Sequence, residues 1–386
     1  ITVSAGMNLE VPIEMVDRTL AGNATLPTTF AGTRTSFNPA AYDGTISYGL
    51  EVFGYNVDVV PRSVHLVDQS GTIRGSVALS GGTGTLTRFE SSFGSMPGTV
   101  TDLRVMLDGS AFFGQVLVVS ARLLVRQSGA TRTRIHIPLL SQKEFSAADD
   151  TIPMDQRINV TFGQDNQHYY SRWMKRSTAF QDIAAGTPWT FEVVLSSSAV
   201  GQPASAVLHS VTGAAAIPGT LVSTTSTSPT LLQASFADGA SGFSASSVVE
   251  AHIASNGAAT VRLHKAALWV DLVNLSRAET YRRIAGYSTT SGAPTLDPNA
   301  MLKLDTTYYS NPEVMLETTG YIIDAGAAAA EISVLDCAIM NSPTWACSPL
   351  PDSMLAFTSP ADQVVTLKRT LPFAVSDGNR FGLAVT

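Results

Sequence analysis

The chain of 386 residues carries 24 lysines and arginines against 31 aspartates and glutamates, a formal net charge of −7, and only 14% of its residues are charged. This acidic balance excludes a protein that binds nucleic acid through a basic surface, and no apolar run reaches the ~18 residues of a membrane span. Hydrophobic residues make up 44% of the chain, enough for large cores. Small polar and β-branched residues dominate over helix formers, so we expect an all-β protein.

The first segment alternates apolar and polar residues, as in a strand with one buried face. Its apolar positions are Ile1, Val3, Ala5, Leu9, Val11 and Ile13. Two interpretations remain open. Residues 1–15 form the first strand of the first domain, or they are a donor strand that completes a sheet in a neighbouring copy.

The following segments recur later in the chain. Residues 63–71, 73–76, 85–93, 103–107 and 121–125 have counterparts at 206–213, 217–220, 230–236, 248–253 and 266–270. Gly75 and Gly219 are 144 residues apart, and Ala121 and Ala266 are 145 apart. A steady offset over five elements indicates an internal repeat. Short alternating strands separated by Gly-Gly, Ser-Gly and Asp-Gly pairs are typical of a β-sandwich.

A third copy follows in residues 331–336, 364–373 and 381–386. The Ala-x-Leu-x-Val strand that closes the first two copies has no counterpart after Phe381–Thr386, so we expect the third sandwich to be one strand short. The alternatives are a different strand order or a chain that continues. A sandwich that lacks a strand has an open edge, and strand donation between identical copies makes rings or filaments.

We therefore predict three tandem jelly-roll-like β-sandwiches. Their expected bounds are residues 1–142, 143–276 and 277–386. The linker that begins at Ser276 contains Arg277, Glu279, Arg282 and Arg283. It is compatible with about two helical turns, up to Ile284.

One strand motif resembles a known group of proteins. The stretch Gly257–Val270 reads G-x-A-T-V-x-L-x-x-A-x-L-x-V and is similar to strands in carbohydrate-binding-module-like jelly rolls of exported bacterial proteins. The resemblance covers the first two repeats and part of the third, and it implies the fold and a surface location. Modules of this kind often hold a structural Ca²⁺ between loop carboxylates. Carboxylates near expected turns or linkers are Asp102, Asp108, Asp149, Asp150, Asp155, Asp352 and Asp362; solvated turn carboxylates are the alternative.

No catalytic constellation is recognisable, because G-x-S-x-G, H-E-x-x-H and P-loop motifs are absent from the sequence. The six histidines are scattered, and His65 and His209 share the repeat offset of 144, which favours a framework role. Neither cysteine has zinc-ligand spacing. We expect a protein that is not an enzyme and has no catalytic residues, no metal ligands and no cofactor.

Cys337 and Cys347 are ten residues apart and are predicted to join the two arms of a hairpin as a disulfide. Two buried thiols are the alternative. The chain begins at Ile1, which we interpret as a mature N-terminus after signal-peptide removal or as a trimmed chain. Together these features predict an extracellular or cell-surface protein.

An aromatic stretch before the second repeat contains Tyr169, Tyr170, Arg172 and Trp173. Rings beside polar groups are suited to a shallow sugar site, or the stretch packs between the first two repeats. Tyr308-Tyr309 has a comparable place before the third copy, which favours packing.

The sequence thus predicts a structural or adhesive surface protein, a filament or surface-layer subunit joined by strand complementation. Its expected partners are further copies of itself or a cell-surface glycan. The alternatives are an array of carbohydrate-binding modules and a viral or phage fibre or capsid protein.

Overall fold

The computed structural model describes most of the chain. The described residues are 6–16, 20–21, 26–109, 116–145, 173–174, 183, 186–255, 259–282, 295–296, 302–303, 308–309, 313–320, 330–341, 344–350, 352–357, 365–370 and 380–385. In these ranges the chain forms strands, 3-10 structure at Pro39–Ala41 and at Tyr308, and no α-helix. None of the helical structure described there has the length and apolar character required to cross a membrane. The expected all-β fold class is confirmed.

The first sandwich consists of two sheets. Its strands are β1 (Met7–Val16), β2 (Leu20–Ala21), β3 (Thr28–Phe37), β4 (Thr45–Asn56), β5 (Arg62–Asp68), β6 (Ile73–Leu79), β7 (Thr83–Phe93), β8 (Thr101–Leu107) and β9 (Val116–Ala130). Sheet A has the order β1-β9-β4-β7, with β2 also on β9, and sheet B has the order β3-β8-β5-β6.

The pairing of these strands is that of one long hairpin rolled up. Apart from the short β2, the first strand pairs with the last (β1 with β9), the second with the second-last (β3 with β8), and so on inward through β4 with β7 to β5 with β6. Rolling this nested hairpin distributes the pairs over two facing sheets, which is the jelly-roll arrangement. The two sheets enclose a common apolar core.

The second sandwich repeats this winding. Its strands are β10 (Arg132–Phe145), β11 (Trp173–Met174), β12 (Pro188–Ser197), β13 (Ala204–Ser210), β14 (Ala215–Ala216), β15 (Val222–Thr224), β16 (Thr230–Ala237), β17 (Val248–Ser255) and β18 (Val261–Val273). Sheet C has the order β10-β18-β12-β16, and sheet D has the order β11-β17-β13-β14, with β15 also on β13. The sequence repeat therefore corresponds to a repeat of strand pairing.

The border between these sandwiches differs from the expected one at residue 142. Residues of β10 pair with β18 over the whole length from Arg132 to Phe145, so β10 belongs to the second sandwich. Only Thr131 separates β9 from β10. Asp43 fixes this junction, because its carboxylate accepts hydrogen bonds from the backbone N–H groups of Thr131 (2.9 Å) and Arg132 (3.0 Å).

The third sandwich is described less completely. Its strands are β19 (Thr295–Leu296), β20 (Leu302–Lys303), β21 (Met315–Gly320), β22 (Ala330–Asn341), β23 (Thr344–Pro349), β24 (Leu355–Phe357), β25 (Val365–Thr370) and β26 (Arg380–Val385). In sheet E, β26 pairs with β19, β20 and β22, and β22 also pairs with β23 and β24; sheet F consists of β21 and β25. These are the three inner pairs of the hairpin. The outer pair, β1 with β9 in the first sandwich, has no counterpart among the described residues.

The apolar residues of β1 belong to the core of their own sandwich. Leu9, Val11 and Ile13 are almost fully buried, and β1 pairs antiparallel with β9 along most of its length. For these three residues the structure shows the simpler arrangement, the first strand of the first domain. Ile1, Val3 and Ala5 lie outside the described residues.

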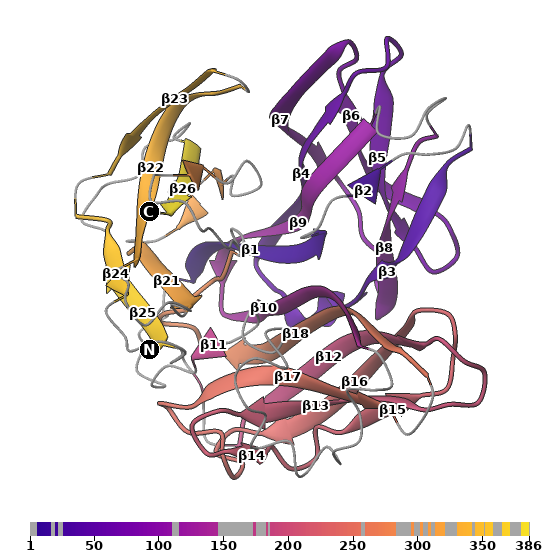
Figure 1. The fold of residues 1–386 in the computed structure, drawn as a ribbon, viewed down its shortest axis with the longest axis vertical. Coiled ribbons are helices and arrows are strands. Elements are labelled where there is room, and N and C mark those ends of the chain that lie inside the picture. Colours follow the sequence, from indigo (N-terminus) through magenta and orange to yellow (C-terminus); the bar gives the residue numbers. More distant parts are fainter. Residues whose placement is uncertain are drawn as a thin grey trace.

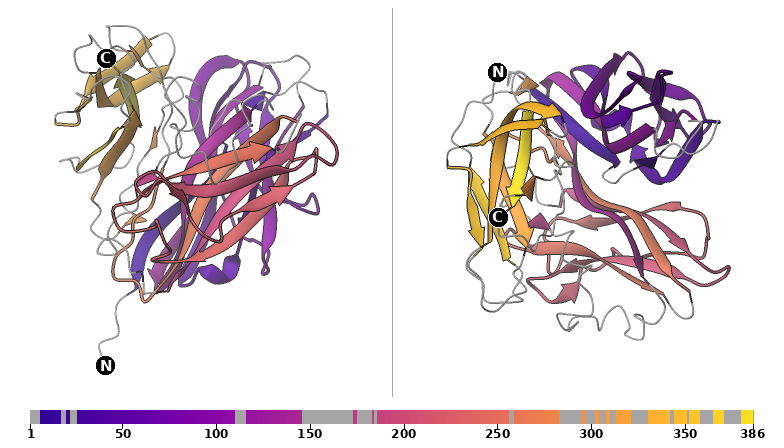
Figure 2. Two further views of the ribbon diagram at one scale, coloured as in Figure 1. Left: turned by 60° about the horizontal axis from the view of Figure 1, so that its bottom comes forward. Right: turned by 45° about the horizontal axis from the view of Figure 1, so that its top comes forward.

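The three sandwiches are arranged as a triangle rather than end to end (Figure 1). The first, in indigo and purple, and the second, in magenta and salmon, lie against each other, and the third, in gold, lies beside both. The same grouping is visible in the right-hand view of Figure 2. β1 runs close to the place where the three sandwiches meet (Figure 1).

In the third sandwich, the register of β22 and β23 places Cys337 directly opposite Cys347. Directly opposed residues of an antiparallel pair have Cα atoms about 4.5–5.5 Å apart, within the range that a disulfide spans. The predicted disulfide is therefore compatible with the backbone register.

We expect the purified chain to contain no free thiol until it is reduced, as measured by thiol titration under denaturing conditions. Replacing both cysteines with serine is expected to lower the free energy of unfolding of the third sandwich by about 2–3 kcal/mol, because the short loop is no longer closed in the unfolded chain. Two titratable thiols in the unreduced protein would contradict the prediction.

Candidate functional site

The outer face of sheet A carries opposite charges on neighbouring strands. The register sets Glu14 of β1 beside Arg122 of β9, and Arg122 beside Glu51 of β4. Glu10 of β1 lies beside Arg126 of β9 in the same way. Side chains directly opposite each other in an antiparallel pair are close enough to interact. The sequence of this sheet therefore builds a charge cluster before any other part of the chain is added.

Each carboxylate of the cluster is held by guanidinium groups. Arg122 donates from Nε to Glu14 at 2.7 Å and from Nη1 to Glu51 at 3.2 Å. Glu51 and Glu90 face each other across β4 and β7, and Arg88 relieves the repulsion by donating to Glu51 at 2.7 Å and also to Glu90. The complete charge cluster consists of Glu10, Glu14, Glu51, Glu90, Arg88, Arg122, Arg126 and Arg282.

Arg282 reaches the cluster from the segment that follows the second sandwich. It donates from Nη1 to Glu51 at 3.3 Å and from Nη2 to Glu10. The hydroxyl group of Tyr309 donates to the backbone carbonyl of Glu10 at 3.0 Å, and the ring of Tyr308 packs under the guanidinium of the neighbouring Arg126, 4.3 Å from ring centre to carbon. Arg282 and the pair Tyr308-Tyr309 thereby attach the part of the chain that follows the second sandwich to sheet A.

The described part of the linker before the third sandwich does not form the short helix that its sequence allows. The described residues 276–282 contain no helical turn. Their path brings Arg282 onto sheet A, where its side chain is 6% exposed. The ion pairs with buried Glu10 and Glu51 account for the difference, because local helix propensity is weak compared with satisfying buried carboxylates.

The electrostatics of the cluster favour its charged state. Burial raises the pKa of Glu51, but Arg282, Arg122 and Arg88 outweigh this effect and lower it to about 2. Burial acts to lower the pKa of Arg282, and the carboxylates of Glu10 and Glu51 nevertheless raise it above its ordinary value. Glu51 is 1% exposed. The cluster is thus a largely buried set of paired charges, with Arg88 and Glu90 at its partly exposed border, and it connects β1, β4, β7 and β9 with residue 282.

A second set of polar contacts joins the first two sandwiches. Glu192 of β12 is 1% exposed. Its carboxylate accepts hydrogen bonds from the hydroxyl of Thr35 at 2.7 Å and the backbone N–H of Ser36 at 3.1 Å, both on β3. Gln233 of β16 donates to it at 2.8 Å. A strand of sheet B is therefore fixed to the outer face of sheet C.

His136 of β10 lies at the same interface. Its Nδ1 accepts a hydrogen bond from the backbone N–H of Glu14 at 3.3 Å, and its ring meets Trp269 edge to face, with centroids 4.6 Å apart. Burial, Lys265 and Arg134 hold the pKa of His136 well below 6.5. The imidazole is therefore neutral at neutral pH, as an accepting Nδ1 requires.

This arrangement predicts acid sensitivity that begins below pH 6.5. A histidine whose pKa is lower in the folded state than in the unfolded state contributes stability above the unfolded pKa of about 6.5, and loses it as the pH falls, by at most about 1.4 kcal/mol per pH unit. In the variant His136→Asn, we expect the free energy of unfolding to vary less between pH 6.5 and pH 5 than in the wild type. Equal slopes in urea unfolding of the two proteins over this range would contradict the assignment.

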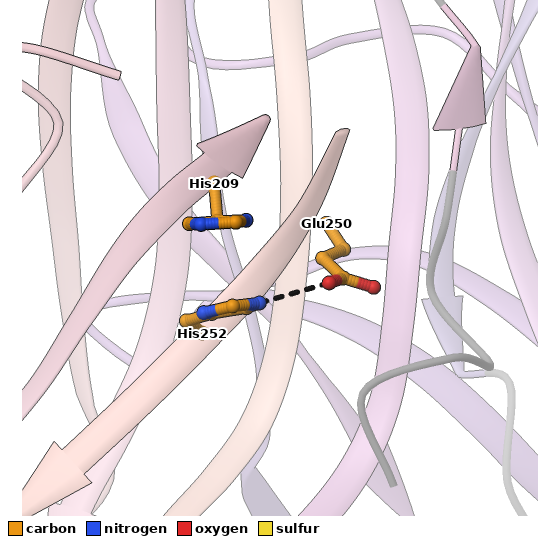
Figure 3. Close-up of side chains that lie close together, drawn as sticks. All are labelled: His209, Glu250 and His252. Carbon is orange, nitrogen blue, oxygen red and sulfur yellow. Dashed lines mark hydrogen bonds and ion pairs between the residues drawn. The ribbon is translucent and has the colours of Figure 1, made fainter. Parts of the chain in front are cut away.

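The structure also brings together, in the second sandwich, three residues of types that can bind a metal ion. His209 on β13 is directly opposite Glu250 on β17, and His252 lies two residues farther along β17 on the same face. Figure 3 shows the two imidazole rings stacked and the carboxylate directed at His252. The ring centroids are 4.0 Å apart and the planes differ by 9°; His252 Nε2 and Glu250 Oε1 are 2.8 Å apart.

One potential ligand atom from each of these residues lies within 4.8 Å of the other two. All three residues are 4–5% exposed. We call His209, Glu250 and His252 the histidine triad. Sequence reasoning assigned His209 to the framework and expected no metal ligands. The signal that was available is Glu250-Ala-His252, two ligand types at the period of two that a strand places on one face.

The other predicted site residues are placed as follows. Trp173 of β11 is opposite Val249 of β17, while Tyr169, Tyr170 and Arg172 lie outside the described residues, so the proposed sugar patch stays a prediction. Asp102 is held by Arg34, and Asp108 by the backbone N–H of Ser63 and by His65. Protein groups therefore bind both of these carboxylates. Asp149, Asp150, Asp155 and Asp362 lie outside the described residues.

Comparisons with known proteins identify no family. No family model matches the sequence, and no curated protein matches it. A structure titled for the triple jelly roll fold and turret assembly in an archaeal virus is 9% identical, with 99% of this chain and 88% of that chain covered and a TM-score of 0.21. The tandem CBM22 domains of Paenibacillus barcinonensis Xyn10C are 6% identical, with 69% and 94% covered and a TM-score of 0.20.

The PBSX exported protein XepA is 12% identical, with 68% of this chain and 86% of that chain covered and a TM-score of 0.18. At such TM-scores these likenesses carry no argument about this chain.

Proposed function

We propose that this chain is a non-enzymatic building block of an extracellular surface assembly, in which copies join by strand addition. The observation that carries the proposal is the edge of sheet F. Among the described residues, β21 pairs with β25 and with no second strand, whereas its counterparts β4 and β12 have neighbours on both sides. An open strand edge presents backbone N–H and C=O groups to an incoming strand.

Two further features support a role in assembly. The charge cluster and the contacts of Glu192 hold separate sandwiches together, so that the chain can act as one rigid block. The segment ahead of β1 alternates apolar Ile1, Val3 and Ala5 with polar residues, as a donated strand requires. In this proposal, residues 1–5 of one copy add to β21 of the next.

The test compares two double variants of the full chain. Ile1→Asp with Val3→Asp places charges on the apolar face of the proposed donor strand, and Thr2→Asp with Ser4→Asp places the same charges on its polar face. We expect ordered polymers from the wild type and from the second variant, and monomers from the first, measured by light scattering after gel filtration and by electron microscopy. A monomeric wild type, or equal assembly of the two variants, would overturn the proposal.

A further inference from the structure

We propose that the histidine triad of the second sandwich binds a divalent transition-metal ion, with Zn²⁺ as the ion that fits its ligands best. Two imidazole nitrogens and one carboxylate oxygen form a set of three protein ligands that is common for Zn²⁺. Ca²⁺ and Mg²⁺ prefer oxygen ligands throughout. The metal would therefore be a transition ion rather than the loop calcium considered from the sequence.

The backbone fixes the spacing of the three ligands. His209 and Glu250 are a direct pair across β13 and β17, and His252 is the diagonal neighbour of His209. In a tetrahedral Zn²⁺ shell with bonds of about 2.0–2.1 Å, ligand atoms lie about 3.4 Å apart. The potential ligand atoms of the triad already lie within 4.8 Å of one another. Tilting the two rings out of their parallel stack closes this gap, and the terminal torsion of histidine is soft enough for that change.

Burial and charge at this position favour the binding of a metal ion. All three side chains are 4–5% exposed. A carboxylate among the ligands compensates part of the charge of a divalent ion, and the low water content strengthens the attraction. Three protein ligands leave one position of a tetrahedral shell for a further ligand.

The internal repeat supplies a comparison within the same chain. In the first sandwich, His65 pairs with Met106 in the register in which His209 pairs with Glu250. Asp108 is 144 residues before His252, so it has the equivalent position in the first sandwich. Its carboxylate accepts a hydrogen bond from His65 at 3.1 Å. The second sandwich thus has glutamate and histidine where the first has methionine and aspartate.

The first sandwich shows how a histidine is satisfied at this position without a metal. The nitrogens of His65 contact Ser76 at 2.6 Å and Asp108 at 3.1 Å. In the third sandwich the corresponding pair is Ser333 opposite Ala384. Among the described residues, the second copy is therefore the one of the three that places three residues with metal-binding side chains at this point of the fold.

The experiment uses the full chain, unfolded in urea with a chelator and refolded with ZnCl₂ or without metal. We expect about one Zn²⁺ per chain by elemental analysis after gel filtration, and a visible absorption band from tetrahedral Co²⁺ when CoCl₂ replaces zinc. The double variant Glu250→Met with His252→Asp gives the second sandwich the residues of the first. It should fold and lose metal affinity by about 100-fold or more.

His65→Asn is the matched control, because it removes the equivalent histidine of the first sandwich, and it should retain wild-type zinc. Two results would overturn the proposal. One is a wild-type protein that is refolded with ZnCl₂ and then contains clearly less than one Zn²⁺ per chain. The other is a folded Glu250→Met, His252→Asp variant that binds as much zinc as the wild type, since the metal would then lie elsewhere.

Discussion

Replacing Arg122 with methionine is expected to lower the free energy of unfolding of the first sandwich by about 3–5 kcal/mol. Arg122 is 1% exposed and donates to both Glu14 and Glu51. Methionine fills much of the same volume but leaves two buried carboxylates with less compensation. Removing one partner of a buried ion pair lowers the free energy of unfolding by more than the intact pair contributes to it. Urea unfolding followed by tryptophan fluorescence and circular dichroism measures the difference.

Arg62→Met is the matched control for this change. Arg62 pairs with Asp58 four residues earlier, and its side chain is 24% exposed. A pair at the surface contributes about 0–1 kcal/mol, because water and salt screen it. If both variants lost the same small amount, the charge cluster would not be a major contributor to stability.

The contribution of Glu51 to the free energy of unfolding is expected to fall by about 3 kcal/mol between pH 5 and pH 2, because the pKa of Glu51 is about 2 in the folded chain against an ordinary value of 4.5. A carboxyl group with a depressed folded pKa stabilises the fold at every pH above its unfolded pKa. That contribution disappears as the pH falls toward the folded pKa, where both states bind the proton. Unfolding curves at several pH values measure this loss.

The variant Glu51→Gln separates this effect from general acid unfolding. It is less stable than the wild type at pH 7, because Arg88, Arg122 and Arg282 lose a carboxylate partner. Its stability should then change less between pH 5 and pH 2. A variant with the pH dependence of the wild type in this range would show that Glu51 is not the group responsible. The contribution of His136 is present in both proteins, so it cancels when the variant is compared with the wild type.

The strands and their repeat could be predicted because both follow local rules. Period-two alternation and glycine turns predict the strands, and the offset of 144 reappears in the structure as equal register, with His65 opposite Met106 and His209 opposite Glu250. The border at residue 142 was misplaced because β9 and β10 are separated by a single residue. The signal was Ser128-Gly129, a turn pair in which Gly129 has a positive φ of 71°.

The residues of the candidate sites were harder to predict because their partners are distant in the sequence. Arg282 and Glu51 are 231 residues apart, and a charged linker with arginines and glutamate reads as a solvated segment. Likewise, His209 is 41 residues before Glu250, and only the strand register makes them neighbours. Such contacts depend on the register of the sheets and on the path of linkers, which composition and periodicity do not determine.

The position of Arg282 has a consequence for the order in which the chain is made. A ribosome releases β1, β4, β7 and β9, with four glutamates and three arginines of the charge cluster, long before residue 282. During synthesis the nascent first sandwich therefore has one more negative than positive charge on the outer face of sheet A, and water must solvate the excess. The second sandwich is complete by the time Arg282 emerges. The ion pairs of Arg282 with Glu10 and Glu51 therefore form only after the second sandwich has been synthesised, so this part of the charge cluster is the last to be completed.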